Sequence, residues 1–296
     1  MKTKRIFLYS LLFIALIAVL SFNFFKEKRV VSKKTETHLH LPNTEHTTLE
    51  IDKIGQIPTP QGYTRNDIPV NSFGDYLRNI SLKSKNSPVK LYNGENKNYQ
   101  ELHYRVLDIS VGKRDLQQCA DAVMRLRAEY LLKTNQKNKI SFNYTSGDAA
   151  IYEKWATGFR PSIKGNKVTW SLQAKADTSY SNFLKYMENV FMYAGSASLS
   201  KELQQKDIQN LEIGDVFIQG GFPGHAVLVV DVALHPTTNK KVFLIAQSYM
   251  PAQDIHILKN FNNEEISPWY EVLNTSSQEI ITPQWIFKQN DLMSFE

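Results

Sequence analysis

Three residues of this chain have the chemistry of a thiol nucleophile and its two partners: Cys119, His225 and Gln247. In such a site a cysteine attacks as the thiolate, a histidine takes and returns its proton, and a polar side chain orients the imidazole. Ser248 is the alternative for the third position. We therefore expect Cys119 to be the nucleophile, His225 the base and Gln247 the orienting residue.

The segment from Asp115 to Lys133 is predicted to position the cysteine. Its apolar residues recur at helical spacing, and Asp115 has the side chain of an N-cap. The first turn of a helix favours an anion, so we expect the pKa of the Cys119 thiol to be lowered there. The backbone N–H of Cys119, with that of Gln118 or Gln117, would stabilise an oxyanion.

The histidine and the glutamine are predicted to lie on neighbouring strands. Runs of β-branched and aromatic residues bounded by Gly, Pro, Asn and Thr predict strands over 215–219, 225–232 and 241–248. His225 begins the middle strand directly after Gly-Gly-Phe-Pro-Gly. If the second and third strands pair as a hairpin, Gln247 lies at the same end as His225. The small residues of the turn indicate an open site around the imidazole.

Composition excludes several classes of function. The chain has 296 residues, 42% of them hydrophobic, and a formal net charge of +6 without an arginine-rich or basic-aromatic run. We therefore expect a globular protein that does not bind nucleic acid. A single cysteine excludes an intramolecular disulfide. His38, His40 and His46 lie in a polar segment without periodicity, so we expect neither a metal nor another cofactor.

The N-terminus has the pattern of a membrane anchor. Residues 6–25 carry no charge and follow a basic start, and a helix of this length crosses a bilayer. A cleaved signal peptide is the alternative, although no small-x-small cleavage site is evident. We divide the chain into an anchor or signal peptide (1–25), a flexible linker (26–56) and one globular α+β domain (57–296). This places the domain in the periplasm or outside the cell, held at the inner membrane.

Aromatic residues and an arginine are candidates for a substrate groove. Trp155 and Arg160 combine a ring with a guanidinium, which together suit a carboxylate, a sugar or a peptide. A structural loop anchor is the alternative for this pair. We expect Tyr249 and Trp269 to line the same groove if the site is catalytic.

The order of these features resembles the papain-like cysteine hydrolases of the NlpC/P60 and CHAP type over residues 115–250. The shared features are the cysteine helix, the strand at Gly214-Asp215-Val216 and the Gly-His-Ala-Val start of the next strand. The resemblance implies an antiparallel sheet packed on the cysteine-bearing helix. It also implies a cell-wall amidase or endopeptidase that acts on cell-wall peptide or glycan.

A more specific resemblance is to the bacterial domain of unknown function 4846 family. Four phrases, spread over most of residues 60–290, carry it: QCADAVMRLRAEYL, GDVFIQGGFPGHAVLVVDVA, AQSYMPAQDIHIL and SPWY. It implies a bacterial, often exported protein and no particular activity. Our hypothesis is a thiol hydrolase of the cell envelope. The alternative is a non-catalytic, membrane-tethered protein that uses the groove for binding.

Overall fold

The computed structural model describes residues 51–275 and 277–296. The anchor predicted over 1–25 and most of the linker predicted over 26–56 lie outside these residues. Within the described ranges, no helix is long and apolar enough to cross a membrane. Ile54 is fully buried, and its N–H donates to the carbonyl of Ile80 at 3.2 Å. The folded part therefore begins before Ile57.

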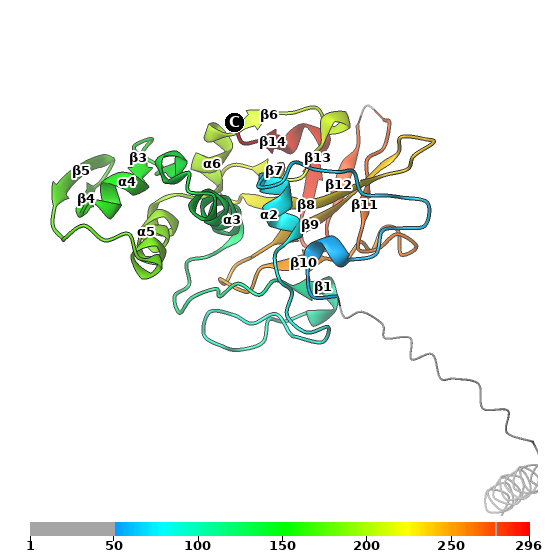
Figure 1. Ribbon diagram of the computed structural model, residues 1–296, viewed down its shortest axis with the longest axis horizontal. Helices are drawn as coiled ribbons and strands as arrows, with labels where there is room; N and C mark the ends of the chain where they lie inside the picture. Colours follow the sequence, from blue (N-terminus) through cyan, green and yellow to red (C-terminus); the bar gives the residue numbers. More distant parts are fainter. Residues whose placement is uncertain (1–50, 276) are drawn as a thin grey trace, which may run out of the picture. The chain divides into compact units, whose positions relative to one another are not determined.

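Helices and antiparallel strands are mixed along the chain, so the fold is α+β (Figure 1). The three predicted strands are confirmed and lie next to one another in the order β9, β8, β7. Within the described residues the main sheet has the path β1-β10-β9-β8-β7-β14-β6, with β11 also paired to β9. Its strands are β1 (His103–Val106), β6 (Gln204–Gln205), β7 (Val216–Gln219), β8 (His225–Leu234), β9 (Lys241–Gln247), β10 (His256–Leu258), β11 (Tyr270–Glu271) and β14 (Leu292–Ser294).

The two faces of this sheet are buried against different partners because side chains alternate along each strand. On β8, Ala226 and Leu228 belong to a core cluster that also contains the buried apolar residues of α3. Val227 and Val229 belong to a second cluster, which includes Phe287 of the hairpin β12–β13. We call these the helix face and the hairpin face of the sheet.

Two of the helices, α2 and α5, begin at a serine whose side chain caps them. The hydroxyl of Ser72 accepts from the N–H of Asp75 at the start of α2. Figure 1 shows α4, α5, β4 and β5 beyond α3, away from the main sheet. The remaining elements are α2 (Phe73–Arg78), α3 (Cys119–Lys133), α4 (Tyr152–Ala156), α5 (Tyr180–Tyr193), α6 (Ser196–Glu202), β2 (Ser141–Asn143), β3 (Ala149–Ile151), β4 (Phe159–Lys164), β5 (Lys167–Leu172), β12 (Glu279–Ile281) and β13 (Ile286–Lys288).

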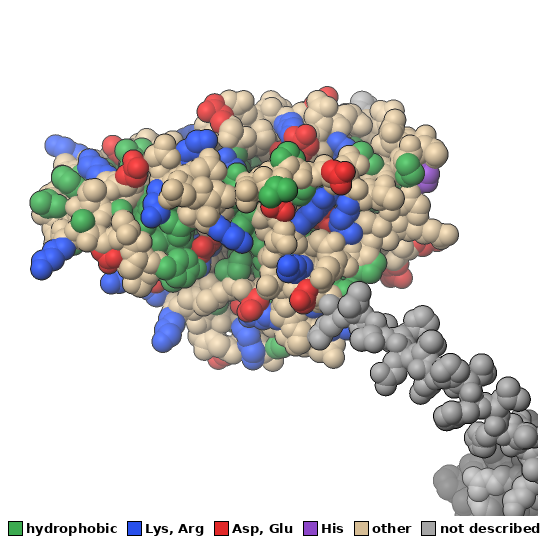
Figure 2. Space-filling model, viewed as in Figure 1, with side chains coloured by type: hydrophobic (Ala, Val, Ile, Leu, Met, Phe, Trp, Pro, Cys, Tyr) green, Lys and Arg blue, Asp and Glu red, His purple; other side chains and the backbone are tan. Residues whose placement is uncertain are grey.

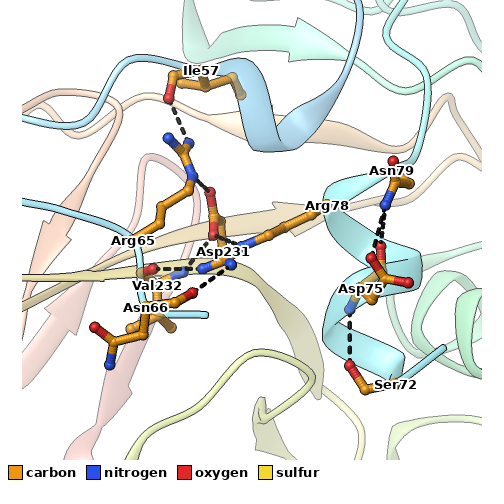
Figure 3. A network of polar contacts seen from close by, with 9 residues as sticks. All are labelled: Ile57, Arg65, Asn66, Ser72, Asp75, Arg78, Asn79, Asp231 and Val232. Atoms are coloured by element: carbon orange, nitrogen blue, oxygen red, sulfur yellow. Dashed lines mark hydrogen bonds and ion pairs between the residues drawn. The ribbon is translucent and has the colours of Figure 1, made fainter. Parts of the chain in front are cut away.

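A buried carboxylate ties the N-terminal segment to β8 (Figure 3). The side chain of Asp231 has no solvent exposure and accepts from Arg65 Nε at 2.6 Å and from Arg78 Nε at 2.7 Å. Arg65 also donates to the carbonyl of Ile57, and Arg78 to the carbonyl of Val232. Asp231 therefore bridges two segments that lie more than 150 residues from it in the sequence.

A β-bulge aims Asp231 at these arginines. The register between β8 and β9 shifts between Val229 and Asp231. As a result, Val230 packs in the helix-face cluster, whereas Val229 and Val232 pack in the hairpin-face cluster. One extra residue on a bulged strand breaks the alternation of faces. Asp231 consequently lies on the side of α2, where Arg78 reaches it.

Candidate functional site

The predicted chemistry converges at one end of the sheet. Cys119 is the first residue of α3, His225 the first of β8 and Gln247 the last of β9. The hydroxyl of Ser248 donates to the carbonyl of Gln117 at 2.9 Å, which fastens the end of β9 to the segment before the helix. The structure thus brings the start of the cysteine helix to the strand ends that carry the other two residues.

The start of α3 differs from the prediction. Asp115 does not cap the helix, because its carboxylate accepts from the N–H of Ala252 at 2.7 Å and from the Gln118 side chain at 3.2 Å. The N-cap is Gln118, and its N–H donates to the carboxylate of Asp121 at 3.0 Å. The predicted use of the Gln118 N–H as an oxyanion donor is therefore wrong, since Asp121 already occupies it.

The electrostatics of Cys119 are the reverse of the prediction. Burial, and then the nearby carboxyl of Asp121, raise the pKa of its thiol to about 11. Backbone N–H groups of Ala226, Ala120 and Cys119 itself lie close enough to the sulfur to oppose that rise. The first N–H groups of a helix lack intrahelical partners. Those of Cys119 and Ala120 can therefore also donate hydrogen bonds to an oxyanion. The resting residue is a neutral, half-buried thiol surrounded by hydrogen-bond donors.

His225 is enclosed and not open as predicted. It is 1% exposed, and its ring lies 4.9 Å from that of Tyr249, 5.3 Å from Trp285 and 5.8 Å from Phe287, between centroids. Burial lowers its pKa to about 4, so the imidazole is neutral at neutral pH.

The glycines before His225 pack against α6 and do not open the site. A Cβ on Gly220 would lie 2.0 Å from Ser200 Oγ, and one on Gly224 would lie 2.3 Å from Ser196 Oγ. These distances are shorter than any contact between atoms that are not bonded. The turn therefore needs small residues for close packing.

The predicted partnership of His225 and Gln247 is present as a hydrogen bond. His225 Nε2 lies 2.8 Å from Gln247 Oε1, an oxygen that can only accept. The imidazole therefore carries its proton on Nε2, and Nδ1 has a free lone pair. Within the described part of the chain, Nδ1 makes no hydrogen bond.

Cys119 and His225 are neighbours that do not touch through a hydrogen bond in the described residues. The sulfur lies near the N–H of Ala226, the residue that follows His225. Cys119 packs against the helix-face cluster, whereas the ring of His225 packs against Phe287 of the hairpin-face cluster. The two side chains therefore lie on opposite faces of the sheet, at the end where β8 begins.

Two of the predicted groove residues, Trp155 and Arg160, pack on each other and connect α4 to its neighbours. The Arg160 guanidinium lies 4.0 Å from the Trp155 ring centroid and donates to the carbonyls of Trp155 and Phe159. Trp155 Nε1 donates to Asn182 Oδ1 at 3.0 Å, which connects α4 to α5. These contacts match the structural alternative for the pair.

The other two predicted groove residues have different surroundings. Trp269 is 1% exposed and donates to the carbonyl of Pro58 at 2.8 Å, so it is a core residue. Tyr249 is half-buried beside His225, and burial, followed by the charge of a Cys119 thiolate, raises the pKa of its hydroxyl. Tyr249 therefore belongs to the site and Trp269 does not.

Sequence reasoning missed the residues that surround the His225–Gln247 pair. His256 and Gln284 approach the Gln247 amide nitrogen at 3.5 and 2.9 Å. Trp285 donates from Nε1 to Gln219 Oε1 at 3.0 Å, which fixes the ring beside His225. The apolar residues of QDIHIL indicate a strand that begins at His256. That strand pairs with the one that ends at Gln247, so His256 could have been considered for the site. No comparable signal marked Gln284.

A groove of about 300 Å³ lies between α3 and α5, apart from the histidine. Arg125 on its wall pairs with Glu129 at 2.7 Å and also donates to Gln117 and to Tyr180. The face in Figure 2 shows hydrophobic side chains among charged ones around a hollow near the centre of the view. Among the described residues, no group of three or more His, Cys, Asp and Glu side chains is placed to hold a metal ion.

Fold and site together define an α+β protein in which a helix-initial cysteine and a buried histidine–glutamine pair lie at the same end of an antiparallel sheet. The chain belongs to the family described as domain of unknown function (4846), whose model matches residues 54–294. No curated protein and no solved structure matches the chain. The resemblance to the NlpC/P60 and CHAP families is without support from these comparisons.

Proposed function

We propose that this protein is a thiol hydrolase of papain-like design that cleaves amide bonds of the cell envelope. The observation that carries the proposal is the hydrogen bond from His225 Nε2 to Gln247 Oε1, because it leaves the lone pair of Nδ1 available as a base. The next residue, Ala226, has its N–H near the Cys119 sulfur. The N–H groups near the Cys119 sulfur supply the oxyanion donors. The proposal includes a globular domain tethered at the inner membrane and facing the periplasm.

The resting pair is neutral, so the chemistry follows general-base catalysis. His225 Nδ1 takes the thiol proton while the sulfur bonds to the carbonyl carbon, and the imidazolium then protonates the leaving amine as the C–N bond breaks. Water next attacks the thioester carbon and gives a proton to Nδ1. As the C–S bond breaks, the imidazolium returns that proton to the Cys119 sulfur, and the carboxylic acid is released. Catalytic hydrogen bonds are often long in free enzymes and shorten with substrate bound. In this proposal the Cys119 side chain turns past the sheet end to meet Nδ1.

The experiment is the rate of Cys119 alkylation by iodoacetamide in the full-length chain, measured from pH 5 to pH 10. With His225 as base, we expect a nearly flat profile, because the imidazole is already unprotonated above its pKa of about 4. In His225→Ala, the rate should follow the thiolate and rise steeply toward a thiol pKa of about 11. At pH 7 the native chain should react on the order of 100-fold faster, as general-base assistance allows.

Two controls make this result specific. Cys119→Ala identifies the modified site, since the chain has no other cysteine. His235→Ala removes a half-buried histidine of the turn between β8 and β9, far from the site in the sheet, and should leave the profile unchanged. Superimposable profiles for the native chain and His225→Ala would rule out the general base. Modification only after unfolding would make Cys119 a core residue.

The alternative is a binding protein without catalysis. The observation that favours it is the groove between α3 and α5, whose lining includes neither Cys119 nor His225. A non-catalytic chain would show the superimposable profiles described above, so the same measurement separates the two functions.

A further inference from the structure

The orientation of the Gln247 amide decides which nitrogen of His225 is the base. A glutamine side chain has an acceptor at one end and a donor at the other, and a flip exchanges them. In the flipped state the NH₂ group would face His225 and would bind its Nε2 lone pair. The proton of the imidazole would then move to Nδ1, where a base is needed.

His256 and Gln284 hold the Gln247 amide nitrogen on the far side from His225. Gln247 Nε2 lies 2.9 Å from Gln284 Oε1 and 3.5 Å from His256 Nε2. The contact to Gln284 is the shorter one, but Gln284 is itself an amide that can flip. The direction of the network must therefore be fixed at His256.

His256 cannot reverse its role, because its other nitrogen lies 2.9 Å from the carbonyl oxygen of Asp254. A carbonyl only accepts, so Nδ1 carries the proton and Nε2 presents a lone pair. The residue has no solvent exposure, and burial lowers its pKa to about 3, which keeps the ring neutral. A flipped Gln247 would point its oxygen at this lone pair and at Gln284 Oε1, two contacts between acceptors.

We infer that His256 and Gln284 are positioning residues that set the tautomer of His225 through Gln247. The chain of hydrogen bonds has one direction: His225 Nε2 donates to Gln247, Gln247 donates to His256, and His256 donates to the Asp254 carbonyl. This direction leaves His225 Nδ1 unprotonated. Its catalytic meaning rests on the proposed hydrolase. The tautomer itself is a property of the folded chain and needs no substrate.

The test is long-range ¹H–¹⁵N NMR of the full-length chain with ¹⁵N-labelled histidine at pH 7, which distinguishes the tautomers of each ring. In the native chain, we expect the Nε2–H form of His225 to exceed the Nδ1–H form at least ~10-fold, the ratio that corresponds to about 1.4 kcal/mol. The double variant His256→Phe with Gln284→Leu should bring the ratio close to one. Glutamine in place of phenylalanine at position 256 of that double variant should restore the preference only in part, because its amide oxygen can accept from Gln247 but the amide, unlike the His256 ring, can flip.

His103→Phe is the matched control, since the His103 ring lies 6.1 Å from that of His256 but makes no hydrogen bond to Gln247 in the described residues. It should leave the tautomer ratio unchanged. The single variant Gln284→Leu, at a half-buried position, supplies a milder change if the double variant does not fold. It should lower the ratio by ~3-fold, the loss of part of one neutral hydrogen bond.

The outcomes separate this inference from the proposed function. A ratio that stays at the native value in both Gln284→Leu and the double variant overturns the inference, even if Cys119 is reactive. A native tautomer preference that is lost in the double variant supports it, even if Cys119 alkylation shows no dependence on His225. An Nδ1–H tautomer in the native chain overturns it directly.

Discussion

Replacing Asp231 with alanine should lower the free energy of unfolding by about 3 kcal/mol, because two arginines lose the carboxylate between them. The Asp231 side chain has no solvent exposure, whereas Arg65 and Arg78 are 22% and 13% exposed. Their residual contact with water places the loss at the lower end for a broken buried ion pair. Thermal unfolding of the full-length chain should show a midpoint lower by roughly 6–12 °C.

An exposed ion pair gives the matched comparison. Arg114 and Glu188 lie 3.3 Å apart with side chains 53% and 44% exposed, so Glu188→Ala should cost no more than about 1 kcal/mol. A second variant tests the cause. Converting all three partners to apolar residues (Asp231→Leu with Arg65→Met and Arg78→Met) should recover part of the loss, because no charge remains unpaired. A midpoint for Asp231→Ala equal to that of Glu188→Ala would contradict the bridging role.

The same cluster shows what the sequence could not predict. The strands from Val216 to Gln247 were predictable, because their β-branched runs and turn residues are local signals. The bulge before Asp231 was not, since the run from His225 to Leu234 is almost continuously apolar and shows no change of face. The partnership of Asp231 with Arg65 spans 166 residues, and a single sequence contains no trace of such a pairing.

The candidate site was also predictable only in its local features. His225 begins one strand and Gln247 ends the next, so antiparallel pairing of these consecutive strands places the two residues side by side, as predicted. The hairpin β12–β13 that encloses His225 comes from nearly 60 residues further along the chain, so the predicted open site is enclosed. The prediction of a lowered pKa for Cys119 was wrong for a related reason. The helix-terminal field was inferred from local sequence, whereas the burial that outweighs it comes from tertiary packing.

Asp121 should make the stability of the folded chain fall as the pH rises. It is the third residue of α3, buried, and burial raises the pKa of its carboxyl from 3.8 to about 8. The folded state therefore holds a proton that the unfolded state releases above pH 4. The contribution is fully present below pH 4 and is lost between pH 4 and pH 8. A shift of about four pH units corresponds to roughly 5 kcal/mol.

Asp121→Asn should remove this dependence, because the amide oxygen can still accept from the Gln118 N–H and carries no charge. We expect the variant to unfold near the native midpoint at pH 5 and to exceed the native stability by several kcal/mol at pH 8. The pKa of Cys119 should also fall, since the Asp121 charge is one of the causes that raise it. Chemical denaturation at four pH values and the iodoacetamide profile measure the two effects.

Asp75→Asn is the control that separates charge burial from helix capping. Asp75 is also the third residue of its helix and accepts from the N–H of Asn71 at 2.9 Å, but it is only half-buried. Capping alone would change the stability of both variants similarly at every pH. If Asp121→Asn is less stable than the native chain at pH 8, the carboxyl is ionised in the folded state. Its negative charge would then be a stabilising part of the helix start, and the thiol beside it would lie next to a permanent anion.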